Sequence, residues 1–349
     1  MKVVVTGAAG VIGRRVCARL ADGGATVLAL DLHTSDLQRA GLPVDVQRVD
    51  LARADLSPML AGADVLVHLA RSFPPEAALL DDGRPDLDAA RRVLDAAAAS
   101  GVQHAVIVSS AMVYGAWPNN PVPLTEDAPI RPNPEFAFAV HLAELERRAL
   151  DWRAAHPSAS LTVLRPAVIV ADAQPSKVAR LLRSVGAIRT DEGDPPAQFL
   201  HADDLADAIV VVARAQVDGV VNVAPDGWIP PETFSALVWN RPRPRLPRWV
   251  ASAIASTRWR LGLASAPPGL VPYTIYPWVV ANDRLRSLGW TPSNTNEEAF
   301  VVGHEPGPLD QLNARRRQQL ALGISGGVLA ATVAAVIALV IRHRRRRNR

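Results

Sequence analysis

The chain has 349 residues, 49% of them hydrophobic and 21% charged, which predicts one large globular domain with a smaller annex, or two domains. Its formal net charge is +4, but six arginines stand in residues 342–349, so the rest of the chain carries 4 − 6 = −2. This balance excludes a broad nucleic-acid-binding face. A single cysteine, Cys17, excludes a disulfide framework and a cysteine metal site.

The first thirty residues predict a dinucleotide-binding turn. In the stretch TGAAGVIG, between a β-branched strand at 2–6 and a helix at 13–21, glycines stand at Gly7, Gly10 and Gly13. The first permits a tight turn, the second lets backbone approach a pyrophosphate, and the third lets the helix pack closely on the strand. The N–H groups at the helix N-terminus then face the anion. The alternative is a turn that keeps the fold and has lost the ligand.

An acidic residue follows at the expected distance. A second strand is predicted at 26–30 and ends at Asp31, eighteen residues after Gly13. A carboxylate there can accept hydrogen bonds from both hydroxyls of an adenosine ribose, which favours NAD over NADP.

Strands and helices keep alternating beyond this point. Further strands are predicted at 44–49, 64–69 and 105–108, with an alanine-rich helix at 85–100. The pattern is a βαβ series, so we predict an α/β fold with a Rossmann-type doubly wound parallel sheet.

A series of motifs over residues 1–300 resembles the extended short-chain dehydrogenases/reductases, the NAD-dependent epimerase/dehydratase family. The motifs are TGAAGVIG with Asp31, Asp50-Leu51, His68-Leu69-Ala70, Val108 to Gly115, Leu164 to Val170, Phe199 to Ile209 and Asp283 to Pro292. The resemblance implies NAD as the cofactor. The cofactor-binding residues that it implies are Gly7, Gly10, Val11, Ile12, Gly13, Asp31, Asp50, Leu51, Leu69, Ala70 and Ser109.

The resemblance also implies two domains. Residues 1–170 would form the NAD-binding Rossmann domain, on which 197–225 also pack, and 171–300 would mainly form a smaller substrate domain. Within the latter, Ser252 to Leu263 is expected to be a buried helix, since helices with apolar stripes usually face a core. A helix lying on a membrane is the alternative.

The expected catalytic helix departs from the family pattern. Family members use a Ser or Thr with Tyr-x-x-x-Lys, where the Tyr moves a proton and the Lys lowers its pKa and holds the cofactor ribose. Ser110 falls on the serine position, but Phe138 and Leu142 fall on the Tyr and Lys positions. No other register helps, because the only lysines are Lys2 and Lys177. Conventional Tyr/Lys catalysis is therefore not expected.

Other ionisable groups on or near this helix are candidate replacements. Tyr114 is the expected substitute proton donor. His141 is expected to be solvated or satisfied in the core, and Glu144 fits a surface salt bridge equally well. His201 with Asp203-Asp204 suggests a metal or a catalytic pair, but the acidic first turn of a following helix explains it, so we expect no metal site.

The C-terminal region predicts a membrane anchor. Residues 320–341 contain no charge, and as a helix they would span about 33 Å, close to a hydrocarbon core. A polar tether at 301–319 precedes this transmembrane helix, and a basic tail at 342–349 follows it. The arginine-rich tail favours a cytoplasmic C-terminus. The folded domain has no secretory signal and is also expected in the cytoplasm, so the direction of the tail is left open.

Together these features predict a membrane-anchored NAD-binding protein. We expect it to act on a nucleotide sugar or an envelope or lipid precursor, by NAD-dependent hydride exchange without the usual Tyr/Lys pair. A homodimer of the kind common in the resembled family is left open, and no nucleic-acid partner is expected. The rival hypothesis is a non-catalytic module at the membrane that senses NAD(H) or acts as a scaffold.

Overall fold

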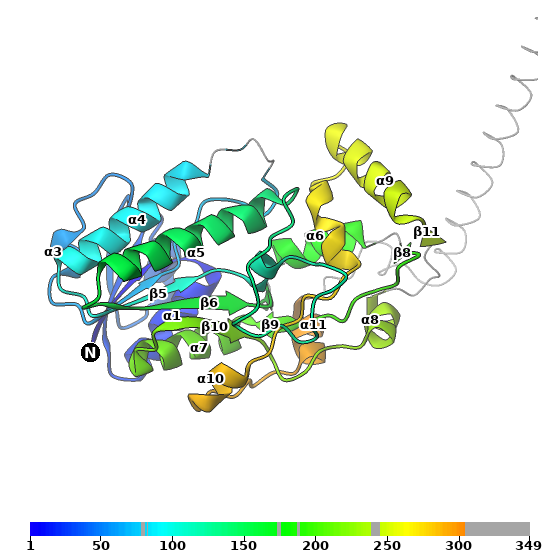
Figure 1. Cartoon of the computed structure of the whole chain (residues 1–349). Coiled ribbons are helices and arrows are strands. Elements are labelled where there is room, and N and C mark those ends of the chain that lie inside the picture. Colours follow the sequence, from blue (N-terminus) through cyan, green and yellow to red (C-terminus); the bar gives the residue numbers. More distant parts are fainter. Residues whose placement is uncertain (78–80, 82, 173–175, 187–188, 239–244, 304–349) are drawn as a thin grey trace, which may run out of the picture. The chain divides into compact units, whose positions relative to one another are not determined.

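A parallel sheet of seven strands, in the order β10-β6-β5-β4-β1-β2-β3, forms the centre of the computed structural model (Figure 1). Its strands are Lys2–Thr6 (β1), Thr26–Asp31 (β2), Asp45–Arg48 (β3), Val65–His68 (β4), His104–Val108 (β5), Ser160–Pro166 (β6) and Gly219–Val223 (β10). The chain winds outward from β1 to β3 and then crosses back to β4 on the other side of β1. This is the doubly wound α/β sheet that the sequence predicts.

Helices cover both faces of the sheet (Figure 1). On one face α1 (Val11–Asp22) packs against α7 (Ala202–Ala215). The other face carries α3 (Ser57–Leu60), α4 (Arg84–Ala99) and α5 (Ala137–Ala155), and α2 (Ser35–Ala40) lies between β2 and β3 in the chain. The central strands β1, β4 and β5 are apolar because both of their faces are buried, whereas the edge strand β3 is polar and mostly exposed.

Alternate residues of β1 show how the two cores divide. Val3 and Val5 belong to the cluster that contains Leu20 of α1, whereas Val4 belongs to the cluster that contains Leu94 of α4. Successive side chains of a strand point to opposite faces, so one short strand contributes to both cores. The bounds predicted for β1 to β5, α1 and α4 differ from the observed ones by at most two residues.

The helix that carries Phe138, α5, begins at Ala137 because a turn precedes it, in which the Phe136 N–H donates to the Asn133 carbonyl. A short 3₁₀ helix, η1, lies between β5 and α5 in the chain, at Ala111–Tyr114.

The remaining elements come from the second half of the chain. They are β7 (Val168–Val170), α6 (Lys177–Val185), β8 (Arg189–Thr190), β9 (Phe199–His201), α8 (Pro231–Val238), β11 (Arg245–Leu246), α9 (Arg248–Arg260), η2 (Pro268–Leu270), η3 (Pro272–Thr274), α10 (Asp283–Ser287) and α11 (Asn296–Gly303). Short parallel pairs join β7 to β9 and β8 to β11. Residues 1–303 group into one unit, so the domain boundary at residue 170 stays an interpretation of the sequence.

The prediction of a buried helix at 252–263 is wrong. Ala251 alone is buried among the residues of α9, and Trp249 is 74% exposed. Leu261 and Leu263, just after the helix, are 65% and 67% exposed. The helix rests on the molecule by one narrow face, since the arginines that it carries keep most of its surface in water.

The structure describes residues 1–303 except 78–80, 82, 173–175, 187–188 and 239–244. Within this part of the chain no helix is both long enough and apolar enough to cross a bilayer. The predicted transmembrane helix at 320–341, with most of its tether and its basic tail, lies outside the described residues.

Candidate functional site

The glycine turn between β1 and α1 is packed as tightly as its sequence predicts. Gly7 has a φ of +70°, and a Cβ there would lie 2.5 Å from the backbone nitrogen of Ala70. A Cβ on Gly13 would lie 2.3 Å from the carbonyl oxygen of Gly7. Gly10 is the N-cap of α1, and no side chain caps this helix. The N–H groups of its first turn are therefore available to an anion such as a pyrophosphate.

Asp31 stands beside this turn at the end of β2. Its carboxylate accepts hydrogen bonds from the N–H groups of Ala9 and His33, both at 2.9 Å. These bonds hold the Asp31 side chain next to the glycines, where its carboxylate can also accept hydrogen bonds from ribose hydroxyls. Asp50 and Leu51 follow β3 at the same edge of the sheet.

The ends of β4 and β5 complete this edge. Leu69 and Ala70 follow β4, and Ser109 follows β5. Parallel strands bring their C-terminal ends together, and doubly wound sheets bind ligands there. The Ser109 side chain is buried, and its Oγ has no hydrogen-bond partner among the described residues. This unsatisfied hydroxyl, the close glycine contacts and Asp31 fit a bound NAD, and Val11 and Ile12 lie in the helical turn that would face it.

A pocket of about 340 Å³ opens next to this edge. Its wall has two cations, several serine hydroxyls and an apolar remainder, and no carboxylate is among its described lining residues. The wall is formed by Arg71, Ser72, Phe73, Pro74, Pro75, Ser109, Ser110, Met112, Phe138, Ala167, Val168, Ile169, Ser176, Lys177, Val178 and Trp278. A small molecule with an anionic group and an apolar part suits such a wall.

Ser110 reaches this pocket from the end of β5. It is the N-cap of η1, and its Oγ accepts a hydrogen bond from the Met112 N–H at 3.2 Å. The hydroxyl proton is not used in that bond, so it can be donated to a ligand oxygen. The structure thus places Ser110 where the resemblance implies it.

The first turns of α5 present an aromatic ring to the pocket and no ionisable group. Phe138 lines the wall, and the guanidinium carbon of Arg71 lies 5.6 Å from the centre of its ring. That distance is within the range of a cation–π contact. Leu142, one turn further along, is fully buried in the apolar core. The cation beside Phe138, Arg71, therefore comes from the loop after β4 rather than from α5.

His141 points away from the pocket into a buried cluster. Its Nε2 lies 3.0 Å from a carboxylate oxygen of Asp86, and its ring stacks on Phe73 with centroids 4.2 Å apart. Burial alone would raise the pKa of Asp86, but hydrogen bonds from His141 and from Ser72 outweigh it and lower that pKa. His141 is thus satisfied in the core, which was the expected reading. Glu144 is paired with surface arginines of the same helix.

The expected role of Tyr114 conflicts with its position. The Tyr114 hydroxyl donates to Asn222 Oδ1 at 2.8 Å and accepts a hydrogen bond from Arg165, also at 2.8 Å. Arg165 in turn pairs with Glu146, and both side chains are almost wholly buried. Burial raises the pKa of Tyr114, and the side chain does not line the pocket. Tyr114 is part of a core network that joins η1 to β6 and β10, so it is not placed to protonate a substrate.

The acidic group around His201 mainly supports the fold. His201 caps α7 by accepting from the Asp203 N–H, and Asp203 forms ion pairs with Arg15 and Arg19 of α1. Ligand atoms of Asp172, His201 and Asp203 lie within 4.8 Å of one another, close enough for one cation. The two guanidinium groups beside Asp203 oppose a further positive charge there.

Two cations and two aromatic rings of the pocket wall were not anticipated from the sequence, namely Arg71, Lys177, Phe73 and Trp278. Arg71 gave a usable signal, because it directly follows Leu69-Ala70 at the end of a predicted strand. Lys177 and Trp278 gave none. Lys177 begins α6 and Trp278 lies outside the helices and strands, about a hundred residues further along. Only the folded chain brings them to one pocket.

The parallel sheet and the glycine turn define a Rossmann-type dinucleotide-binding protein. Residues 3–224 match a family model described as "NAD dependent epimerase/dehydratase family", and the chain belongs to this family. The resemblance seen in the sequence is thereby confirmed, and NAD is the cofactor of the protein.

Several known proteins are similar over much of their length. A 3-diazoavenalumate denitrifying reductase from Streptomyces sp is 28% identical over 84% of this chain and 97% of that protein. A UDP-glucose 4-epimerase from Azospirillum brasilense is 32% identical over 60% of this chain and 67% of that protein. Among solved structures, MoeE5 in complex with UDP-glucuronic acid and NAD has a TM-score of 0.63 at 23% identity, covering 86% of this chain and 97% of the other.

Proposed function

We propose that the protein is a membrane-anchored, NAD-dependent oxidoreductase that exchanges hydride with an anionic small molecule without a Tyr/Lys proton-transfer pair. The observation that carries the proposal is the pocket beside Ser110, whose described wall residues include two cations, no carboxylate and Phe138 in place of an acid. Such a wall attracts negative charge and holds it, but Phe138 cannot move a proton.

The residues of this wall have distinct roles in the proposed reaction. NAD supplies the hydride acceptor or donor. Ser110 can donate a hydrogen bond to a substrate oxygen, and Arg71 can stabilise negative charge that develops on the substrate. Both interactions are electrostatic. Hydride addition to a carbonyl leaves an alkoxide, and because Phe138 has no acidic proton, water in the open pocket supplies the proton that completes the alcohol. Asp31 and the glycine turn hold the adenosine and pyrophosphate parts of the cofactor.

The proposed substrate is a nucleotide sugar or another anionic envelope or lipid precursor. The epimerase relative and the UDP-glucuronic acid complex support the first of these, and the basic pocket supports an anionic group in either. The reductase relative supports net hydride transfer rather than epimerisation. An epimerase must remove and return a proton, a task for which Phe138 offers no group.

Membrane anchoring is supported by the uncharged run at 320–341 and the arginines after it. We place the folded domain in the cytoplasm, next to the bilayer. An added C-terminal cysteine tests this arrangement. Labelling of that cysteine from outside intact cells means that the helix spans the membrane, and resistance to alkaline extraction without labelling means that it inserts without crossing.

The test of the proposed reaction uses the full chain in detergent. NADH binding is measured by fluorescence, and NADH oxidation is then followed with anionic candidates that include UDP-glucose and UDP-glucuronic acid. The variants are Ser110→Ala and Arg71→Gln, and the matched control is Arg91→Gln, an exposed arginine of α4 outside the pocket. We expect both pocket variants to lose at least tenfold in kcat/KM, the effect of removing about 1.4 kcal/mol of transition-state stabilisation. Turnover that neither variant changes would overturn these roles.

A second function is favoured by the same helix. A pocket with Phe138 and a buried Leu142 suits a protein that binds NAD(H) and reports its redox state to a membrane partner without turnover. Tight NADH binding with no hydride exchange on any candidate, in a protein that shows different protease protection with NAD and NADH, would support this sensing role instead.

A further inference from the structure

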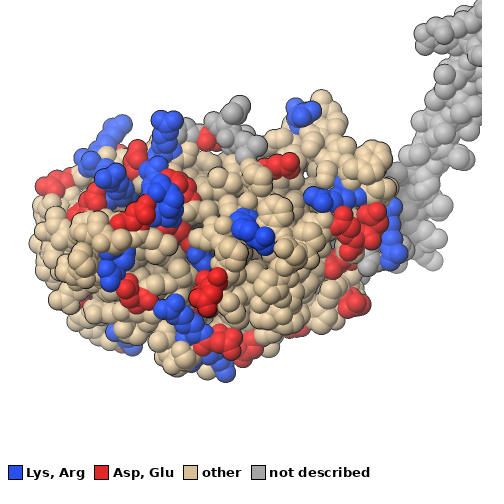
Figure 2. Space-filling view, viewed as in Figure 1, with Lys and Arg blue, Asp and Glu red and all other residues tan. Residues whose placement is uncertain are grey.

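The acidic residue Asp86 of α4 differs from the acidic residues around it. Charged side chains of both signs crowd the outer surface over α4 and α5 (Figure 2). There Asp88, Asp95 and Glu144 are paired with arginines. The side chain of Asp86 is only 10% exposed, and the residues bonded to it are a serine and a histidine. A nearly buried carboxylate beside a ligand pocket is a candidate for proton transfer.

Ser72 links Asp86 to the substrate pocket. It lines the pocket, and its N–H and its hydroxyl both donate to Asp86 Oδ1, at 2.6 and 2.9 Å. The other carboxylate oxygen of Asp86, Oδ2, lies 3.0 Å from His141 Nε2, and the His141 side chain is 4% exposed. A chain of hydrogen bonds therefore runs from the pocket wall through a carboxylate to a buried imidazole.

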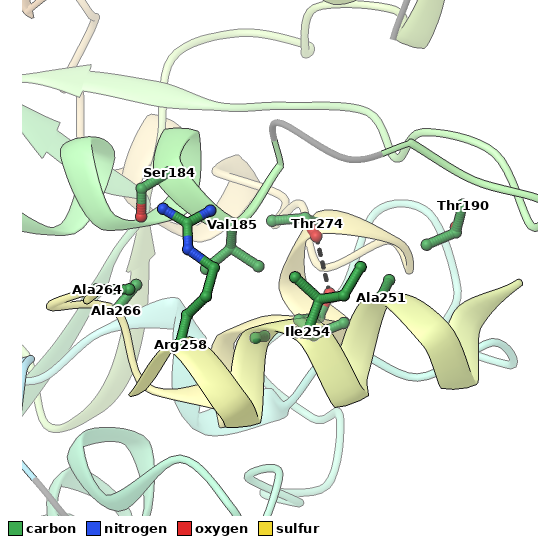
Figure 3. A pocket seen from close by; sticks show the side chains of 11 residues that line it. Ser184, Val185, Thr190, Ala251, Ile254, Arg258, Ala264, Ala266 and Thr274 are labelled. Atoms are coloured by element: carbon green, nitrogen blue, oxygen red, sulfur yellow. Dashed lines mark hydrogen bonds between the residues drawn. The ribbon is translucent and has the colours of Figure 1, made fainter. Parts of the chain in front are cut away.

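Other hydroxyl groups in pocket walls are not joined to an ionisable group. Ser110 and Ser176 accept hydrogen bonds from backbone N–H groups. In the cavity of about 40 Å³ under α9, Ser184 and Thr274 donate to backbone carbonyl oxygens, and Figure 3 shows the second of these bonds as a dashed line. Among the described residues of both walls, only Ser72 donates to a carboxylate.

Ser72 and Ser110 reach the pocket from neighbouring strands. His68, at the end of β4, pairs in register with Ile107 of β5. Ser72 stands four residues after His68, and Ser110 stands three residues after Ile107. Both serines line the pocket at the carboxyl edge of the sheet. A substrate oxygen that accepts a hydrogen bond from Ser110 therefore lies on the side of the pocket that Ser72 also lines.

The groups around Asp86 keep its carboxylate ionised. Burial favours the neutral acid, but hydrogen bonds from His141 and Ser72 outweigh burial and lower the pKa of Asp86. Arg71, in the loop after β4, attracts the same carboxylate, and burial lowers the pKa of His68 to about 4, so that ring is neutral at neutral pH. A cavity of about 10 Å³ between Asp86, Arg71 and His68 has room for one water molecule. Asp86 can therefore accept a proton and pass it to water.

We propose that Ser72 carries the proton of the substrate hydroxyl and hands its own proton to Asp86, while His141 holds Asp86 in place. The proposal rests on the proposed function and assigns the path of the proton in that reaction. When a substrate alcohol is oxidised, its C–H and O–H bonds break and a C=O bond forms. The hydride goes to the cofactor, the alcohol proton goes to Ser72 Oγ, and the Ser72 proton goes to Asp86 Oδ1. In the reduction these movements reverse and water returns the proton to Asp86, so water stays the source of the proton.

This path suits a carboxylate with a lowered pKa. The O–H group of the alcohol becomes strongly acidic as its carbon loses the hydride, so even a weak base can take the proton. The hydrogen bond that Ser72 donates to Asp86 also makes the Ser72 oxygen a better proton acceptor, because bonds in such a chain polarise one another. Ser72 is thus the catalytic residue, and Asp86 and His141 are positioning residues that act through it.

The test compares variants that remove the proton path and keep the fold. Asp86→Asn keeps a side-chain oxygen for the Ser72 N–H but cannot take up a proton at neutral pH. Ser72→Ala removes the hydroxyl, and Ser72→Thr retains one. The control Asp95→Asn changes an exposed carboxylate of the same helix, outside the pocket. NADH binding, measured by fluorescence, shows that each variant is folded.

Hydride exchange is measured with the full chain in detergent. The alcohols UDP-glucose and UDP-glucuronic acid are tested with NAD, and the carbonyl compound phenanthrenequinone is tested with NADH. Ser72→Ala and Asp86→Asn should each lower kcat about a hundredfold, within the range that general acid–base catalysis contributes. Both should also abolish the solvent deuterium isotope effect on kcat, since the proton no longer moves with the hydride. Ser72→Thr should keep most of the turnover, and Asp95→Asn all of it.

Two results would overturn the proton path alone. Turnover with an unchanged kcat in Ser72→Ala and Asp86→Asn means that water exchanges the proton with the substrate directly. A lower kcat with the solvent isotope effect retained means that Asp86 only anchors the loop at Ser72. Absence of hydride exchange in the native protein, with NADH bound, overturns the proposed function and the proton path with it.

Discussion

Replacing Tyr114 by phenylalanine separates a structural role from a catalytic one. The Tyr114 hydroxyl is hydrogen-bonded to Asn222 and Arg165 in the core, so Tyr114→Phe leaves one acceptor and one charged donor without a partner. An unsatisfied buried group costs about 1–3 kcal/mol. Arg165 keeps three hydrogen bonds to Glu146, which holds its guanidinium in place and favours the lower end of that range for each group. We expect a total loss of about 2 kcal/mol, a thirtyfold change in the unfolding equilibrium.

The assay compares stability with activity in the same preparations. Urea unfolding followed by tryptophan fluorescence gives the change in free energy, and NADH binding of the folded fraction gives the effect on the site. The matched control is Tyr276→Phe. Its hydroxyl bonds to Arg248 and Glu192, both exposed, so water can replace it and the loss should stay within about 0.5 kcal/mol. A Tyr114→Phe protein of unchanged stability that binds NADH and has lost hydride transfer would refute the core-network account and restore the proton-donor role.

Three further predictions concern the cofactor turn, acid stability and the pocket. Gly7→Ala should weaken NADH binding at least tenfold, whereas Gly24→Ala, at a similar positive φ but with open space around it, should leave NADH affinity unchanged in the same fluorescence titration. Burial lowers the pKa of His68 and of His104 to about 4, against 6.5 in the unfolded chain. Between pH 4 and pH 6.5 the unfolded state therefore binds more protons than the folded state. The free energy of unfolding should therefore fall from about pH 6.5 to pH 4, by up to roughly 3 kcal/mol per ring, and His104→Asn should flatten the pH dependence of the urea midpoint. Phe138→Tyr should raise turnover on a substrate that needs proton transfer, because the nearby Arg71 guanidinium lowers the pKa of the introduced phenol. An unchanged pH–rate profile would mean that the introduced phenol transfers no proton.

The structure also decides which of the two family residues, Tyr at 138 or Lys at 142, can be reintroduced as an informative test. Leu142 is fully buried, so Leu142→Lys would place an ammonium in an apolar core and destabilise the protein. Phe138→Tyr alone avoids that cost, because Phe138 already lines the pocket and has Arg71 beside it. Loss of activity in a protein that carries both Phe138→Tyr and Leu142→Lys would thus say little about the pocket.

Much of the fold could be predicted because its signals are local. The β-branched run at 2–6, the spacing of Gly7 and Gly13, and Asp31 after the next strand act over a few residues, and each fixes a turn, a helix start or a strand end. The Rossmann sheet and the NAD site follow from them. A buried helix at 252–263 was a wrong prediction because an apolar stripe does not reveal whether another element will cover it.

The sequence by itself determined the cofactor turn and the absence of any Tyr-x-x-x-Lys, since both depend only on residue type and spacing. The tertiary structure decided which ionisable groups reach the pocket. Tyr114 and His141 are close along the chain to Ser110 and Phe138, which line the pocket. Hydrogen bonds in the core nevertheless hold the side chains of Tyr114 and His141 away from the pocket. Arg71, from the loop after β4, takes the place beside Phe138. Side-chain direction is set by contacts between distant segments, which no local pattern records.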